Sequence, residues 1–85
     1  MKPYKTKEMN DKVRETVKNF QKYWDTHSYY ACQARYLSND EFTLDICHVC
    51  DVPYSIAKRA TWFIRSNYDR DQKALEEWGF NRYTA

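Results

Sequence analysis

The sequence has little of what builds tight turns, crosses a membrane or cross-links a chain. One glycine and two prolines among 85 residues are too few for a sheet of many tightly connected strands, and they favour helices joined by short polar loops. No apolar run approaches the roughly 20 residues that a membrane-spanning helix requires. Residues 1–10 lack the apolar core of a secretory signal. Three cysteines, an odd number, do not suit a disulfide framework, so we expect a cytoplasmic protein.

Signatures of catalysis are also missing. The chain has no glycine-rich phosphate loop, no serine, histidine and aspartate in a catalytic order, and no pair of carboxylates in an evident cleft. The adjacent acids Glu76 and Glu77 are typical of a solvated helix face. We therefore expect neither an enzyme nor a cofactor.

Charge of one sign is not in large excess. The net charge of +2 is too small to indicate a nucleic-acid-binding protein by itself. Residues 1–40 hold eight basic and five acidic side chains, whereas residues 41–85 hold six and seven. The basic excess therefore lies mainly on the first expected helix, where a solvated face is its ordinary role.

Aromatic residues are abundant. The three tryptophans, four phenylalanines and eight tyrosines make up 18% of the chain. Rings bury much area per residue, which suits a small domain that hides only roughly 60% of its unfolded surface. Fifteen rings are also more than such a core holds, so some should lie at the surface, where tyrosine and tryptophan are enriched in interfaces.

The spacing of apolar residues predicts a first helix from Thr6 to Trp24. Thr6 or Asn10 is its expected N-cap. Lysines and arginines occupy the outer faces of this helix. The inward stripe, with steps of three or four residues, comprises Met9, Val13, Val17, Phe20 and Trp24.

A short second helix is expected over residues 29–37, with Ser28 as its N-cap. Tyrosine favours strands, but the alanine, glutamine and arginine of this segment favour a helix. Two inward sets are open, namely Tyr30, Ala34 and Leu37, or Tyr29, Cys32 and Tyr36.

The clearest local signal begins the third helix. Ser38 and Glu41 have the spacing of a capping box, and Leu37 and Phe42 have that of a hydrophobic staple. The signal predicts a helix from Asn39 to about Cys50. Its expected inward residues are Phe42, Ile46, Val49 and Cys50.

A three-residue turn then separates two helices. Asp51, Val52 and Pro53 form it, because proline disfavours helix at the preceding residue and suits the first turn of the next helix. The next helix is expected from Pro53 or Tyr54 to about Ser66. Its inward residues are Ile56, Ala57, Ala60, Phe63 and Ile64.

The C-terminal segment predicts one last helix. Asp69 is its expected N-cap and Gly79 its C′ residue, and Phe80 is then placed to contact Leu75 in a Schellman motif. The chain has no repeat and no internal linker. We therefore predict a single all-α domain of four to five short helices over residues 1–85.

Residues 38–66 resemble the helix-turn-helix family of DNA-binding proteins. Cys47 stands at the family's small position, Asp51 at its turn position and Val52 at the aliphatic position that follows. Ala57 matches a small inward residue of the recognition helix.

The segment departs from the family at two places. Asp51 replaces the usual glycine, and aspartate adopts the left-handed conformation less readily. Thr61 and Trp62 stand where the family often has leucine, which leaves the end of the second helix open.

The resemblance implies a small DNA-binding protein whose second helix enters the major groove. We expect a transcriptional regulator of a phage or mobile element, acting as a homodimer on a palindromic site. The N-terminal half of that helix would meet base edges and its C-terminal end the phosphates. The implied contact residues are Tyr54, Ser55, Lys58, Arg59, Trp62 and Arg65.

A protein partner is the alternative use of the same helix. Trp62 falls on its polar side, and exposed tryptophan more often marks a protein interface than a DNA contact. A compact helical inhibitor or adaptor would bind a host protein through Trp62, Tyr54 and Tyr68. An ordinary solvated face is the simplest interpretation of Lys58 and Arg65.

The cysteines and histidines allow a zinc hypothesis. Cys47 and Cys50 lie on adjacent turns of one helix, and His27 or Cys32 would complete a site if the preceding helix packed against it. His27 and Cys32 are not a usual second ligand pair, and cysteine often only fills space in a core. We therefore expect no metal.

Overall fold

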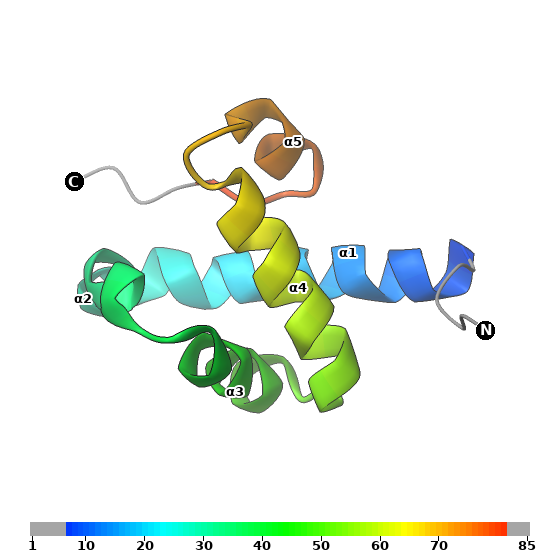
Figure 1. The fold of residues 1–85 in the computed structure, drawn as a ribbon, viewed down its shortest axis with the longest axis horizontal. Coiled ribbons are helices and arrows are strands. Elements are labelled where there is room, and N and C mark those ends of the chain that lie inside the picture. The colour runs from blue at the N-terminus through cyan, green and yellow to red at the C-terminus, as the bar shows by residue number, and fades with distance from the viewer. Residues whose placement is uncertain (1–6, 82–85) are drawn as a thin grey trace.

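Helix α1 (Lys7–Thr26) is the longest element and supports the rest of the chain. A computed structural model describes residues 7–81, and Figure 1 shows the other helices gathered along α1. Within these residues there is no strand, which confirms the predicted all-α fold. The remaining elements are α2 (Ser28–Gln33), the 3-10 helix η1 (Ala34–Tyr36), α3 (Asn39–Cys50), α4 (Tyr54–Asn67) and α5 (Gln72–Glu77).

Helix α4 crosses α1, and α3 packs against both of them (Figure 1). Helix α2 turns back at the end of α1, and the Tyr30 hydroxyl donates to Oδ2 of Asp45 at 2.8 Å, which ties α2 to α3. Helix α5 packs on α4. The radius of gyration is 12.2 Å, close to the roughly 12 Å expected for a folded chain of this length.

Aromatic rings fill the centre of the core. Phe20 and Phe42 meet edge to face with ring centroids 5.5 Å apart, and the rings of Trp24 and Phe80 lie 5.0 Å apart. Burying one large apolar side chain contributes roughly 1.5–3 kcal/mol, so a few rings stabilise this small domain. The buried hydrophobic residues are Val13, Val17, Phe20, Trp24, Ala31, Ala34, Phe42, Ile46, Ile56, Ala57, Ala60, Ile64, Leu75 and Phe80.

The predicted first helix is confirmed, although α1 continues to Thr26. Of the two expected caps, Thr6 lies outside the described residues. Asn10 is wrong as a cap because it lies inside α1, which has already begun at Lys7. The predicted stripe is buried or packed against the core: Val13, Val17, Phe20, Trp24 and Met9.

The predicted cap of α2 is wrong. Ser28 is the first residue of the helix, and its N-cap is His27, whose side chain makes no capping hydrogen bond. The His27 ring instead stacks on Tyr23 at 3.9 Å between centroids, and its Nδ1 lies 3.0 Å from the Tyr23 carbonyl oxygen. The helix ends early at Gln33 and tightens into η1.

Of the two inward sets proposed for residues 29–37, the first is confirmed. Ala34 is buried, and Tyr30 and Leu37 pack against the core. Tyr29 and Tyr36 are 78% and 76% exposed.

The capping box that begins α3 is confirmed. The Glu41 N–H donates to Oγ of Ser38 at 3.1 Å, and the Ser38 N–H donates to Oε1 of Glu41 at 2.8 Å. Two backbone donors at the helix start are therefore satisfied by this reciprocal pair. Leu37 and Phe42, the two residues of the expected staple, both belong to the core cluster.

The inward face of α3 differs from the prediction at Val49. Phe42 and Ile46 are buried as predicted, but Val49 is wrong because it is exposed. The inward face is centred between Ile46 and Thr43, so Val49, three residues after Ile46, turns outward. Cys50, one residue further, packs against the core as predicted.

A buried pair of threonines joins α3 to α4. The hydroxyls of Thr43 and Thr61 lie 2.8 Å apart and form a hydrogen bond, and the Thr43 hydroxyl also bonds the Asn39 carbonyl oxygen at 2.7 Å. Both threonines are almost fully buried. The apolar pattern of the sequence missed them, because a hydroxyl enters a core only when it finds a partner there.

The predicted cap of α5 is also wrong. Asp71, and not Asp69, is the N-cap, and its Oδ1 accepts the Ala74 N–H at 3.1 Å. α4 ends at Asn67, and a turn follows in which the Asp71 N–H donates to the Asn67 carbonyl at 3.0 Å. Asp69 lies within this turn, two residues too early to cap α5.

The Schellman motif after α5 is confirmed. The Phe80 N–H donates to the Leu75 carbonyl and the Gly79 N–H to the Glu76 carbonyl, both at 2.9 Å. Gly79 has a φ of 86°, and a Cβ there would lie 3.2 Å from Cγ of Lys18 on α1. The motif thus returns the chain closely against α1 and places Phe80 in the core.

Candidate nucleic-acid interface

The turn between α3 and α4 has the predicted length of three residues. α3 ends at Cys50, and Asp51 adopts the left-handed conformation with a φ of 55°. Pro53 is the extended N-cap of α4, which begins at Tyr54. Aspartate is one of the few residues other than glycine that adopt this conformation at modest cost. The chain therefore passes from α3 to α4 in three residues without a glycine.

Helix α4 is divided sharply into two sides. Ala57 and Ala60 are fully buried, and these small residues allow α4 to lie close against the neighbouring helices. The opposite side is exposed. Of the six predicted contact residues, five lie there: Tyr54, Ser55, Lys58, Arg59 and Trp62.

Two grooves flank the exposed side of α4. The wider, of about 760 Å³, lies between α4, α1 and the end of α5 and includes Ser55 and Arg59. The narrower, of about 140 Å³, lies between α4 and α3 and includes Tyr54. Lys58 and Trp62 line both grooves, so they form the ridge between them.

Tyr54 is fixed at the start of the ridge. Its hydroxyl donates to Oδ1 of Asp40 on α3 at 3.2 Å. Partial desolvation by neighbouring groups, followed by this hydrogen bond, raises the pKa of Tyr54. With Asp51 also exposed in the turn, acidic groups border the N-terminal end of α4.

Arg65, the sixth predicted contact residue, is half-buried and lines the narrower groove, with its guanidinium directed toward η1 and α3. Its Nη2 donates to the Ala34 carbonyl at 2.9 Å, and its guanidinium lies 4.7 Å above the Phe42 ring. These contacts join the end of α4 to η1 and α3. No local pattern signals them, because Ala34 is 31 residues away in the sequence.

The wider groove has aromatic walls that the sequence did not indicate. Phe63 and Trp78 stack at 3.9 Å between centroids with an angle of 13° between their planes. The Arg14 guanidinium lies 4.8 Å from the Trp78 ring centre. Arg14 and Trp78 come from opposite ends of the sequence, so only the tertiary fold brings this cation to the ring that lines the groove.

Trp62 is the most exposed tryptophan of the ridge and grooves, at 71%. Tyr54 shares its side of α4, but Tyr68 does not. The Tyr68 ring packs edge to face on Trp24 at 6.2 Å, near the other end of the domain. The three aromatic residues of the alternative protein-binding hypothesis are therefore not brought together.

The cysteines and histidines do not converge. All three cysteines are free thiols, and no group of three or more metal-ligating side chains occurs among residues 7–81. The Cys50 thiol donates to the Thr16 carbonyl at 3.6 Å, and burial, followed by the neighbouring Cys47, raises the pKa of Cys50 to about 11. Cys32 is exposed on α2, and His27 is stacked on Tyr23.

From Lys7 to Asn81, none of the helices combines the length and apolar character needed to cross a bilayer. No protein-family model, no curated protein and no solved structure matches the sequence or its fold.

Proposed function

We propose that this chain binds duplex DNA through α4, in the manner of helix-turn-helix proteins. The observation that carries the proposal is the left-handed turn at Asp51 followed by a helix whose N-terminal half is exposed along one side. Figure 1 shows α5 beside the C-terminal end of α4, away from the N-terminal end of that helix. A helix with its side chains is about 10–12 Å wide and fits a major groove about 12 Å wide.

The side chains of the ridge suit this use. Ser55 and Lys58 carry donors for base edges, and Arg59 carries a guanidinium for base or phosphate. Arg14 beside Trp78 adds a cation at the border of the wider groove. The small net charge predicts weak binding by one copy, so a homodimer on two half-sites is the form that would give useful affinity. The role proposed is regulation of transcription.

The experiment is a titration of a fluorescent duplex, followed by anisotropy, as salt rises from about 50 to 200 mM. Binding should weaken steeply with salt. The double substitution Lys58→Ala and Arg59→Ala should reduce affinity at least tenfold and lower the salt slope by about one per lost phosphate contact.

The matched control is Arg70→Ala with Lys73→Ala, which removes the same charge from exposed positions beside and within α5. An equal loss in both double variants would show that only net charge matters. No binding to any duplex at the lowest salt would refute the proposal.

A protein partner is a second candidate, favoured by the exposure of Trp62 beside the Phe63–Trp78 stack. Exposed aromatic residues next to a groove are typical centres of protein interfaces. The basic residues at its border favour an acidic partner. In a pull-down, Trp62→Ala should abolish capture, whereas Lys58→Ala should weaken it mainly as salt rises.

A further inference from the structure

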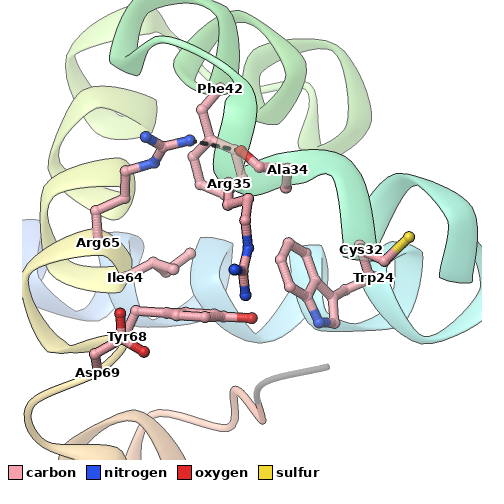
Figure 2. A pocket seen from close by; sticks show the side chains of 10 residues that line it. Trp24, Cys32, Ala34, Arg35, Phe42, Ile64, Arg65, Tyr68 and Asp69 are labelled. Atoms are coloured by element: carbon pink, nitrogen blue, oxygen red, sulfur yellow. Dashed lines mark hydrogen bonds between the residues drawn. The ribbon is translucent and has the colours of Figure 1, made fainter. Parts of the chain in front are cut away.

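A third hollow lies near the C-terminal end of α4, between α1, α2 and η1 (Figure 2). Its volume is about 440 Å³, within the range of roughly 300–1,000 Å³ typical of small-molecule sites. Trp24, Phe42 and Ile64 provide an apolar surface, and Tyr68 lies along one side. The hollow is not lined by any of the five exposed residues of α4 described above, which are Tyr54, Ser55, Lys58, Arg59 and Trp62.

Trp24 brings an unpaired donor to this hollow. The residue is only 4% exposed, and its Nε1 has no hydrogen-bond partner among residues 7–81. A buried donor without an acceptor loses the hydrogen bond that it would make with water in the unfolded chain. Tryptophan usually finds a partner for this group when it is buried. An acceptor that reached Nε1 would therefore recover free energy that the folded chain loses.

Two arginines supply positive charge to the same hollow. In Figure 2 the Arg35 guanidinium, the Tyr68 hydroxyl and the Trp24 indole converge at its centre. Arg65 forms another part of the wall, held by the Ala34 carbonyl. A guanidinium has five N–H donors, so this bond leaves Arg65 with further donors. Asp69 is the acidic residue of the lining, and the two arginines outweigh it.

We propose that this hollow binds a small planar aromatic carboxylate. The ring would lie against Ile64, next to the Arg65 guanidinium that covers Phe42, and the carboxylate would accept hydrogen bonds from Arg35 and Trp24. An uncharged hydrocarbon would leave the Trp24 donor unpaired. Inorganic phosphate would leave the apolar part of the lining uncovered. A carboxylate on a flat apolar body satisfies both parts of the lining.

Binding at Trp24 requires one local movement. Nε1 is buried, and the Tyr68 ring packs edge to face on the indole at 6.2 Å. Tyr68 is the C-cap of α4, where the helix has already ended. The Tyr68 side chain packs against the core, and its rotation away from the indole would open the path to Nε1.

The test is a titration of the ¹⁵N-labelled chain with 2-naphthoate, in which the indole N–H signals of the three tryptophans are followed by NMR. The signals are assigned with Trp62→Phe and Trp78→Phe. The Trp24 signal should shift saturably, while those of Trp62 and Trp78 should stay in place. Naphthalene, which has no acceptor, should not produce the shift.

Arg35→Gln should weaken 2-naphthoate binding at least fivefold, and Lys73→Gln, which removes an equal charge at an exposed position of α5, should leave it unchanged. The proposal fails if the Trp24 signal does not move, or if both substitutions have the same effect. Because DNA is absent from this experiment, its result is independent of the function proposed for the α4 ridge.

Discussion

Lys58 and Arg65 are two cations of the same helix, two turns apart, yet their surroundings differ. Lys58 stands on an exposed ridge between two grooves, whereas Arg65 is held between the Ala34 carbonyl and the Phe42 ring. The same difference separates the exposed outer side of α3 and α4 from the inner side that packs into the core. It shows that residue type alone does not tell a structural cation from one available to a partner.

The largest expected effect comes from removing the inner cation. Arg65→Ala deletes a charged hydrogen bond and a cation–π contact, and should lower the free energy of unfolding by about 2–3 kcal/mol. Lys58→Ala on the outer side should change it by less than about 0.5 kcal/mol. Urea denaturation measures both. An equal loss of unfolding free energy in the two variants would contradict the difference in surroundings between Arg65 and Lys58.

The buried threonine pair should give a smaller effect. Thr61→Val removes one hydroxyl of the pair and should cost about 1 kcal/mol, whereas Ser55→Ala on the outer side should be nearly neutral. Because Thr43 and Thr61 share one bond, the double substitution to valine should cost less than the sum of the single ones. Strict additivity in urea denaturation would mean that the hydroxyls act separately.

Cys50 on the inner side predicts a loss of stability in alkali. Its pKa rises from 9.0 to about 11 in the folded chain, so the unfolded state releases the thiol proton first. The contribution is complete below pH 9 and is lost as the pH rises from 9 through 11. Since the residue is only half-buried, we expect a loss of about 1 kcal/mol.

The measurement compares urea denaturation of the parent chain and Cys50→Ala at pH 8 and pH 10.5. The gap between the two chains should narrow at the higher pH. Alkylation provides a second readout at pH 8, because exposed Cys32 should react faster than Cys50. Faster modification of Cys50 than of Cys32 would contradict the raised pKa of the Cys50 thiol.

The smallest effect on stability is expected on the ridge. Trp62→Ala should shift the free energy of unfolding by about 0.5 kcal/mol or less, because most of the side chain is already in water. Phe63→Ala, which breaks the stack on Trp78, should cost more. Thermal unfolding of the two variants ranks them, and a larger loss for Trp62 would show that its ring supports the core.

Short-range signals explain why much of the fold was predictable. The capping box at Ser38, the turn at Pro53 and the Schellman motif at Gly79 each depend on residues within six positions. Asp71 was missed as a cap because Asp69 has the same chemistry two residues earlier, and only the length of the preceding turn separates them. Local pattern alone could not decide that length.

The candidate site was predictable only in part. The exposed side of α4 follows from helical periodicity, so five of its six expected residues lie there. The orientation of the Arg65 guanidinium depends on its hydrogen bond to the Ala34 carbonyl. The cation beside the groove wall depends on the contact of Arg14 with the Trp78 ring. These contacts join segments far apart in the chain, and a sequence carries no local trace of them.

The threonine pair has a consequence for the surface above it. A slide of α4 along α3 by one turn, about 5.4 Å, would bring Ala57 or Ile64 opposite Thr43 and break the buried bond. The hydrogen bond between the two hydroxyls therefore fixes the position of α4 along the axis of α3. The positions of Tyr54, Lys58 and Trp62 relative to α3 are thus set from inside the domain, and any surface that the ridge fits must match that spacing.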